Sequence, residues 1–600
     1  MESDIVRGAI SRVREKFGTD IKLLKEQKES LSEPYSKKYK AIEILKEMEE
    51  DLTGTVNNIE EYDHISIVLA TIHQQIGILH SDTEELKAAE QRFMKCIELT
   101  SGKEKDPEAI LPRLNALNQL GIIWSQWSVP NKAKKFLDEA EQIYKEYMAE
   151  PEGFKEPVSM ERLFWIDSAE EELDSMKILE KRHTLTLFYL AQVYGALKDQ
   201  HKSAVYCHMT LRRQLGNLDN MEDLDYVEWA LNSATLSQYL MELNGFSETR
   251  HHLAAASYIL KKYEDILKEK YKDTEESEIA KAEWERFNHR SADVAQCWAK
   301  YGILLMVLSR ARLLEKAEKH EEDDEEDTVS NDNANSVCDL KFDVLEKEIE
   351  PIEKQVTDKY LLDFNDARLV FMNAQKWLNE AKTYYTLEDH ASDHVGIVQD
   401  ISRAYKYLAF FEEHEDRQAK MHKRRIDILE DVIKELNPQY YKAVCREIWL
   451  ELGDTYSEIM DIKFDRWLLD SKPAPHVMAK VRNFAEHAIQ NYQALIDSVE
   501  NHKPDDPTQK LPEDLEDVVL HAYFRIGRLY YKVPGSDARI QNRNIQKAFM
   551  AYEYLIDYGK KYPKAVESMK EKYTLCQQLL NLLRPCNKLF NNTKIETKLL

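Results

Sequence analysis

The side chains in this sequence that could most readily do chemistry are histidines beside carboxylates. A zinc protease site needs two histidines four residues apart with a glutamate after the first, so that one helix face presents both imidazoles. His414 is followed by a glutamate, but Gln418 stands where the second histidine is needed. His320 is also followed by a glutamate, but Asp324 stands at that position. His251 is followed directly by another histidine, and adjacent residues of a helix point in different directions. The sequence therefore predicts no metal site.

Motifs for nucleotide binding and nucleophilic catalysis are missing from the 600 residues as well. Neither G-x-x-x-x-G-K-[ST] nor G-x-G-x-x-G, whose glycines let backbone N–H groups reach a phosphate, occurs in the sequence. There is no G-x-S-x-G nucleophile elbow. The abundant carboxylates are interpreted as solvated helix faces. We therefore expect no enzymatic activity and no cofactor.

The basic cluster AKMHKRRIDILE contains Lys420, Lys423, Arg424 and Arg425. It could act in nuclear import or bind an anion. It could also be the charged face of a helix, because apolar residues follow it at helical spacing and acidic residues lie nearby. We favour the second interpretation.

A repeated pattern places these residues on helices. Gly121 is followed twelve residues later by Ala133, and Gly77 is followed at the same spacing by Ala89. The stretch 449–456 reads W-x-x-L-G-x-x-Y, the first-helix signature of a tetratricopeptide repeat. Further copies of the pattern lie at Phe188–Leu211, Leu236–Ala256 and Tyr523–Tyr530. Small residues at these positions let two antiparallel helices approach closely, and one such unit buries its apolar face only by stacking on the next.

These repeats predict an all-α, tetratricopeptide-like helical solenoid in two halves joined by a linking helix and an acidic linker. Seven consecutive acidic residues, Glu321 to Asp327, mark the linker, because like charges repel and cannot enter a core. The spacing to the second helix is longer after Tyr456 and after Tyr530, which we interpret as lengthened loops. The expected domains are an N-terminal helical cap at 1–60, a first solenoid at 61–293, the linking helix at 294–319, the linker at 320–340 and a second solenoid at 341–600.

The composition favours a helical protein and limits the classes of partner that it could bind. Only 16 glycines and 16 prolines punctuate the chain, too few for an all-β fold of this length. The net charge of −26 disfavours nucleic acid and favours either a basic protein surface or simple solubility. The seven cysteines are scattered without a C-x-x-C pair, which is typical of a reducing compartment. The N-terminus lacks the apolar segment of a signal peptide, and the apolar run 301–308 is too short to span a bilayer. We expect a cytoplasmic protein.

Several longer stretches resemble one family, the kinesin-binding proteins, also called KIF-binding protein. They appear in the family's order from about residue 65 onward: HSDTEEL at 80–86, LGIIWS at 120–125, YLAQVY at 189–194, EWALNSATLSQ at 228–238, DHVGIVQD at 393–400, KMHKRR at 420–425 and LNPQYY at 436–441. The segments 1–60 and 150–181 resemble the family only weakly.

The resemblance implies a solenoid that grips the motor domain of certain kinesins in a concave groove and keeps it off microtubules. It also implies roles in axon growth, microtubule organisation and mitochondrial distribution, and association with the cytoskeleton. Microtubules are acidic and the motor face that binds them is basic, so the negative charge of this chain would compete for that face. Binding to nucleic acid or directly to membranes is not expected.

The resemblance also implies contact residues. The family's motor contacts correspond to Tyr189 and Gln192, three apart on one helix, and to Gln214 and Thr235. Tyr189 also fits a packing position between repeats. A basic contact of the family is replaced here by Ser291, beside Arg290, and the loop 215–227 looks longer than usual.

Two other classes remain open for a repeat protein of this kind. A co-chaperone that clamps an acidic peptide needs Lys, Asn and Arg gathered in one groove, and the first helices of the clear repeats contain no such set. A scaffold for tubulin or membranes, without motor inhibition, is the other alternative.

Overall fold

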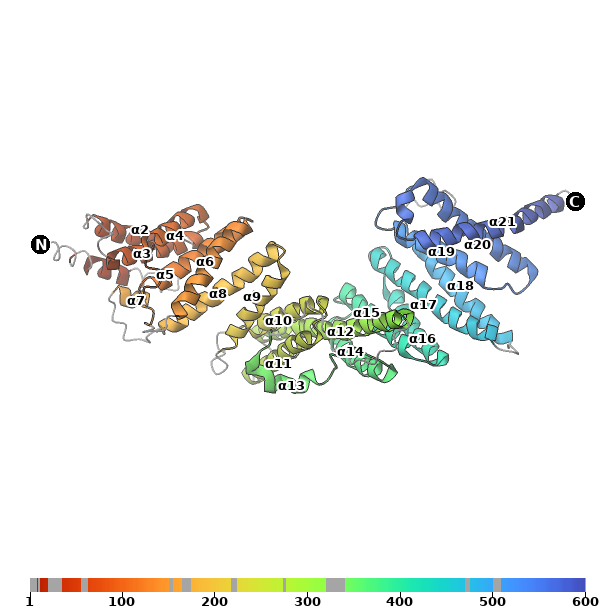
Figure 1. Cartoon of the computed structure of the whole chain (residues 1–600), viewed down its shortest axis with the longest axis horizontal. Helices are drawn as coiled ribbons and strands as arrows, with labels where there is room; N and C mark the ends of the chain where they lie inside the picture. The colour runs from red at the N-terminus through yellow and green to blue at the C-terminus, as the bar shows by residue number, and fades with distance from the viewer. Residues whose placement is uncertain are drawn as a thin grey trace. The chain divides into compact units, whose positions relative to one another are not determined.

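The computed structural model of this chain is a succession of helices. It describes residues 8, 11–19, 35–54, 63–149, 155–164, 174–216, 224–272, 277–319, 340–469, 475–499 and 509–598. No β-strand occurs among these residues, so the predicted all-α fold is confirmed. Figure 1 labels the α-helices, and the colour from red to blue gives their order along the chain.

The helices divide into two compact units, Met1–Tyr239 with Cys338–Glu346, and Leu240–Val337 with Lys347–Leu600. The elements of the first unit are α2 (Ser36–Thr53), α3 (Asp63–Asp82), α4 (Leu86–Leu99), α5 (Ile110–Gln126), α6 (Pro130–Met148), α7 (Met160–Leu163), α8 (Ser175–Ala196), α9 (Gln200–Gln214) and the short 3-10 helix η4 (Asp343–Leu345). α10 (Tyr226–Glu242) and α13 (Glu346–Glu353) cross the division.

The second unit contains the remaining helices. They are α11 (Phe246–Lys270), α12 (Glu278–Lys319), α14 (Phe364–Tyr384), α15 (Ala391–Phe411), α16 (Glu415–Glu435), α17 (Lys442–Leu469), α18 (Pro475–Asp497), α19 (Glu516–Lys532), α20 (Ala538–Lys561), η5 (Pro563–Val566) and α21 (Lys570–Lys598). From α14 to α21 each α-helix packs against the next, as a stacked repeat array requires.

Four turns between paired helices share one backbone conformation. Glu84, Ser128, Lys198 and Asn244 all have φ near +60° (63°, 58°, 63° and 59°). In each turn the next residue donates its N–H to the carbonyl five positions earlier, as Val129 does to Trp124 at 3.0 Å. This is the Schellman arrangement that ends a helix with one left-handed residue. Each left-handed residue lies seven positions after the small residue of the predicted pattern, so the repeats are structurally equivalent at this turn.

The repeat glycines pack against a large residue of the second helix. A Cβ atom added to Gly121 would lie 2.5 Å from Leu137, and one added to Gly77 would lie 2.7 Å from the Phe93 ring. Each of these large residues lies one helical turn after the alanine of the repeat pattern. The small alanine lets the two helices approach, and the large residue one turn later fills the space beside the glycine. In later repeats the glycine partners are Tyr492, against Gly453, and Tyr552, against Gly527.

The lengthened spacing after Tyr456 and Tyr530 arises mainly from longer helices, so the prediction of long loops was wrong. α17 continues thirteen residues beyond Tyr456, and α18 begins thirteen residues before its pattern residue Ala488. Between α19 and α20 only residues 533–537 lie outside helix. Apolar side chains continue at helical spacing through both extensions, including buried Phe464 and Met478, and this favours helix over loop.

The long helix α12 begins at Glu278, earlier than the predicted linking helix at 294–319. Trp298 stacks on Trp377 of α14 with ring centroids 5.7 Å apart, and its Nε1 donates to Ser257 of α11 at 2.9 Å. α12 thus packs within the second unit. The acidic linker lies outside the described residues except for position 340, and so does much of the predicted N-terminal cap. The domain limits stay a prediction.

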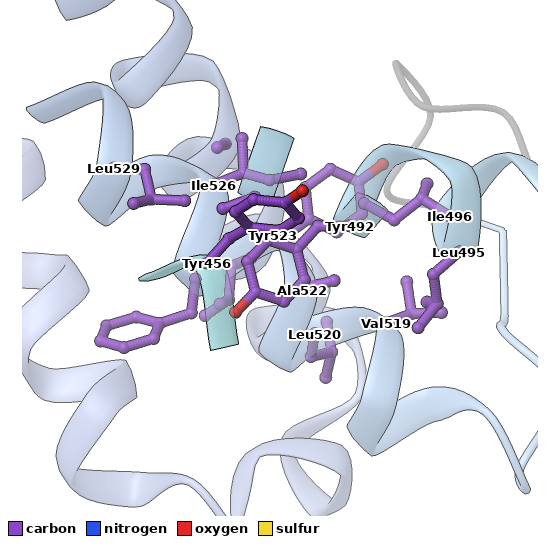
Figure 2. Close-up of a cluster of buried hydrophobic side chains, with 14 of the residues drawn as sticks. Tyr456, Tyr492, Leu495, Ile496, Val519, Leu520, Ala522, Tyr523, Ile526 and Leu529 are labelled. Carbon is purple, nitrogen blue, oxygen red and sulfur yellow. The ribbon is translucent and has the colours of Figure 1, made fainter. Parts of the chain in front are cut away.

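The largest buried cluster lies in the second unit, over α15–α21. Figure 2 shows part of it, where Tyr456 of α17, Tyr492 of α18 and Tyr523 of α19 lie among aliphatic side chains. Each helix contributes its apolar stripe to this continuous core, which is how repeats that could not fold alone stabilise one another. None of the helices in the described parts of the chain is both long and apolar enough to cross a bilayer.

Carboxylates along α17 hold neighbouring helices together. They recur at alternate spacings of four and three residues and so share one helix face: Glu447, Glu451, Asp454, Glu458, Asp461 and Asp465. Asp461 pairs with Arg528 at 2.8 Å and with Lys532 at 2.6 Å, both on α19. Glu458 accepts from Arg425 of α16 at 2.5 Å. The interpretation of the carboxylates as solvated faces was therefore wrong for this helix.

Candidate partner-binding site

The helix that carries Tyr189 and Gln192 is fixed by buried polar groups. Asn118 of α5 donates to the Arg182 carbonyl at 2.9 Å and accepts from the Thr186 hydroxyl at 2.8 Å. Asn118 and Thr186 are completely buried, and buried hydrogen bonds of this kind specify one register between helices. α8 therefore presents its next turn, residues 189–192, in a defined orientation.

His183 anchors the same helix to α6. Its Nε2 bonds the Glu141 carboxylate, and its ring stacks on Tyr144 with centroids 3.5 Å apart. Burial lowers the pKa of His183 below its usual value, so the imidazole is neutral near pH 7 and donates Nε2–H. Burial opposes ionisation of Glu141, but hydrogen bonds from His183 and Lys145 outweigh it and lower the pKa of Glu141. This buried pair holds α8 and does not face the candidate surface.

Gln192 lies on the exposed stripe of α8, and Tyr189 lies at its edge. The buried residues of the helix include Leu187, Leu190 and Val193, so the solvent-facing positions fall between them. Gln192 is exposed and makes no hydrogen bond with the described residues. Tyr189 is half-buried and packs beside Leu190 and Val193. It therefore has a packing role between helices as well as an accessible edge.

Phe188 is a surface residue that the sequence reasoning missed. Its side chain is 38% exposed, and its ring meets Tyr189 edge-on with centroids 5.3 Å apart. It lies one helical turn before Gln192, so both side chains project from the same face. The signal was present in the sequence, because an aromatic residue four positions before Gln192 must share its exposed stripe.

The second helix of this repeat, α9, carries Gln214 at its end. Ser203 donates its hydroxyl to the Ala191 carbonyl at 2.8 Å, and Tyr194 stacks on Tyr206 at 5.5 Å, which joins α9 to α8. Gln214 is exposed as the last residue of α9 and makes no hydrogen bond with the described residues. Most of the loop 215–227 that follows lies outside the described residues, at 217–223.

The start of α10 lies beside the end of α9. Trp229 is buried and donates Nε1–H to the Leu211 carbonyl at 3.1 Å, one turn before Gln214. Thr235 follows six residues later on α10, about 9 Å along the helix axis. It is exposed, and its hydroxyl donates to the Leu231 carbonyl at 2.8 Å. Glu228, two turns earlier on the same face, is exposed as well.

The four predicted contacts thus lie on three successive helices of the first unit. Two of them are amides without partners among the described residues, so they are available to accept and donate hydrogen bonds. The surface offers aromatic edges, amides and a carboxylate, which suits binding of a protein surface. Within the described residues, no group of three or more His, Cys, Asp or Glu side chains could hold a metal ion.

Two other predicted features belong to the second unit. Arg290 pairs with Asp293 of its own helix at 2.8 Å. Ser291 is half-buried, and its hydroxyl finds no partner among the described residues. The two adjacent histidines on α11 bond different partners. His251 contacts the Glu353 carboxylate at 2.8 Å, and His252 donates to the Glu248 carbonyl at 2.8 Å.

The fold defines an all-α helical repeat protein, and the candidate surface on its first unit is polar and aromatic. The sequence model of a family described as "KIF-1 binding protein C terminal" matches residues 227–587. The chain is 35% identical over 580 residues to the KIF-binding protein of Gallus gallus, with 93% of each chain covered. It is 33% identical over 542 residues to that of Homo sapiens, with 86% of this chain and 83% of the relative covered. A solved structure described as a cryo-EM map of KIFBP matches with TM-score 0.64 and 27% identity, covering 96% of this chain and 99% of that one. The chain belongs to the KIF-binding protein family, which confirms the resemblance in the sequence.

Proposed function

We propose that the chain binds the motor domains of a subset of kinesins and blocks their attachment to microtubules. It would thereby regulate microtubule-based transport and organisation, axon growth and mitochondrial distribution, as a cytoplasmic protein associated with the cytoskeleton. The observation that carries the proposal is the similarity, along 93% of the chain, to a relative whose name states that it binds KIF proteins. The proposed action is sequestration, so it needs a complementary surface and no catalytic group.

The surface proposed for the motor comprises Tyr189, Gln192, Gln214 and Thr235, to which we add Phe188. Support comes from the exposure of all of these residues except the half-buried Tyr189, and from the unpaired amides of Gln192 and Gln214. Buried packing beneath them fixes the helices, so little order would have to be gained when a partner binds. Aromatic side chains that already have defined positions are frequent anchors of protein interfaces.

Placing a positive charge on this surface is expected to weaken motor binding. In Gln192→Lys the new ammonium would face a basic motor surface, and like charges brought together in an interface oppose association. We expect the Kd for a sensitive kinesin motor domain to rise about tenfold or more, the scale of an interface hot spot. Fluorescence anisotropy with a labelled motor domain would measure the Kd, and microtubule co-sedimentation would show the motor returning to the pellet.

The matched control is Gln91→Lys, at an exposed position of α4 with the same change in charge. It should leave the Kd nearly unchanged. Equal weakening by both substitutions would contradict the proposed surface. If no kinesin motor binds the unaltered chain, the sequestering function fails, and a scaffold role without motor inhibition takes its place.

Salt should weaken this interaction. The chain has a net charge of −26, and attraction to a basic motor surface acts over several ångströms of solvent. Raising the salt from about 0.1 M to about 1 M shortens the Debye length from about 10 Å to about 3 Å. We expect the association rate to fall several-fold over this range, with a smaller change in dissociation rate. Stopped-flow association at a series of salt concentrations would measure it, and a rate that does not change with salt would refute the electrostatic contribution.

A further inference from the structure

A groove of about 490 Å³ lies in the second unit, and none of its lining residues is proposed to contact the motor. α19 contributes Tyr523, Ile526 and Tyr530, and α20 contributes Met550 and Tyr554. Gln493 of α18 also lines the groove. α19 therefore lines the groove between the helices that precede and follow it. Tyr523 and Ile526 also border the buried cluster in Figure 2, which fixes the α19 side of the groove.

The middle of the groove is apolar. Tyr523 and Tyr554 stack with ring centroids 4.1 Å apart and are 8% and 5% exposed. Met550 borders them and is 57% exposed, although its neighbour Ala551 is buried. An apolar side chain placed here would remove Met550 and the tyrosine edges from water, which is favourable by the hydrophobic effect. Flexible methionine adapts to the shape of such an occupant.

The two ends of the groove differ in charge. At one end the Lys547 ammonium donates to the Tyr530 hydroxyl at 3.0 Å and lies 4.8 Å from that ring's centroid, so this cation is already engaged. At the other end Glu553 and Asp557 lie four residues apart, on one face of α20. Asp557 pairs with Lys560 at 2.8 Å.

Glu553 makes no hydrogen bond or ion pair with the described residues. Glu553 is an exposed residue, but partial desolvation of its carboxyl, and then the negative charge of Asp557, raise the pKa of that carboxyl. The Arg584 and Lys560 cations oppose these two causes only in part, so a cation brought closer to the carboxylate would still be favourable. The carboxylate end of the groove is therefore suited to a positive charge.

We propose that this groove docks a short peptide segment of a partner protein, with an apolar or aromatic side chain against Met550 and Tyr554 and a lysine or arginine at Glu553 and Asp557. From Met550 to Asp557 the helix rises about 10 Å. An extended peptide covers that distance in about three residues. The docked segment therefore carries its apolar anchor about three positions from its basic residue. The interaction is separate from motor binding and does not depend on it.

Selection from a phage-displayed library of random 12-residue peptides on the full chain tests the proposal. The recovered peptides should combine an aromatic or long aliphatic residue with Lys or Arg about three positions away. Met550→Glu should weaken the Kd of recovered peptides about tenfold or more, because it places a charge where the apolar anchor packs. Glu553→Lys should weaken them as well, by removing the site for the cation. Met94→Glu, at a 45% exposed position of α4, is the matched control and should change nothing.

Three outcomes would overturn the proposal. One is that no recovered peptide distinguishes the unaltered chain from Met550→Glu or from Glu553→Lys. Another is that the recovered peptides are rich in Asp and Glu. The third is a concentration-dependent dimer in analytical ultracentrifugation that Met550→Glu abolishes, since a second copy of the chain would then occupy the groove. Melting curves check that both variants fold. Because Met550 and Glu553 are both exposed, the two substitutions test the groove independently.

Discussion

Replacing Arg425 with methionine is expected to destabilise the second unit around α15–α17 by about 3–5 kcal/mol, the usual cost of breaking a buried ion pair. The Arg425 side chain is 1% exposed. Its guanidinium donates to Ser402 at 3.1 Å, to His422 at 3.0 Å and to Glu458 at 2.5 Å. Methionine preserves much of the volume but leaves these acceptors without their cation.

Hydrogen exchange of peptides from α15 to α17 would measure this loss as a change in local opening free energy. Arg424→Met is the matched control, because Arg424 is the exposed neighbour of Arg425 and the substitution is the same. We expect it to change stability by less than about 0.5 kcal/mol. Peptides from α5 in the first unit should be unaffected by either variant. Equal effects of the two substitutions would mean that the buried network contributes nothing.

The loss should also depend on pH. Burial, helped by the Arg425 cation and opposed by the Glu458 carboxylate, lowers the pKa of His422 to about 4. A histidine whose pKa is lower in the folded chain than in the unfolded chain loses stability as pH falls from about 6.5 toward about 4. In Arg425→Met the cation is gone while Glu458 remains 3.2 Å from His422, so His422 can take up a proton and replace part of the lost charge. The stability difference between the variant and the unaltered chain should therefore be smaller near pH 5 than near pH 7.5.

The cluster that contains Arg425 illustrates what sequence could and could not predict. The sequence favoured a charged helix face over a free anion site, and Lys423 does pair with Asp427 on that face at 2.8 Å. The sequence did not indicate that Arg425 is buried, because the three basic residues of the stretch KRR cannot be told apart from the sequence alone. Only the packing of α15 and α17 against α16 distinguishes the buried arginine from the exposed Arg424. Burial of a charge depends on tertiary partners, which local pattern does not contain.

The repeat architecture was predictable because its signals are local. Gly77 with Ala89, and Gly121 with Ala133, placed the helix pairs correctly, and the left-handed turn residues follow at a constant offset. The extended α17 was not predicted, because the expected repeat length led us to assign its surplus residues to a loop. Apolar periodicity through Phe464 was the better guide.

The candidate surface was predictable only in part. Helical periodicity accounts for the exposure of Gln192 and the missed exposure of Phe188. The placement of Gln214 beside α10 depends on the hydrogen bond from Trp229 to Leu211, a contact eighteen residues apart that no repeat pattern specifies. Similarity to the family supplied these residues, and the structure supplies the positions of their side chains.

The acidic charge has two roles that the salt experiment must separate. Asp461 and Glu458 are paired across helices, so part of the −26 charge stabilises the fold. The pairs of Asp461 with Arg528 and Lys532 are partly exposed and weaken as salt rises. A fall in motor association with salt is therefore informative only where the melting temperature of the chain, measured at the same salt concentrations, is unchanged.

Replacing Gly453 with valine is expected to destabilise the α17–α19 region by about 3 kcal/mol, at the upper end of the usual range for overpacking. A Cβ atom at this position would lie 2.6 Å from Cε1 and 2.8 Å from Cδ1 of Tyr492. The ring cannot easily move aside, because Tyr492 is completely buried and its hydroxyl donates to Asp454 at 2.5 Å. Figure 2 places Tyr492 within the surrounding cluster. Valine is a better helix former than glycine by a few tenths of a kcal/mol, too little to offset the clash.

Gly396→Val on α15 is the matched control, since a Cβ there meets nothing within 4 Å. It should change stability by less than about 0.5 kcal/mol, so the same substitution separates close packing from helix propensity. Combining Gly453→Val with Tyr492→Leu tests the named contact, because removing the ring should recover part of the loss and give a favourable coupling energy. Additive losses in that double variant would place the strain elsewhere. Because each repeat contacts only its neighbours, exchange should rise in α17–α19 and stay unchanged in α3–α6.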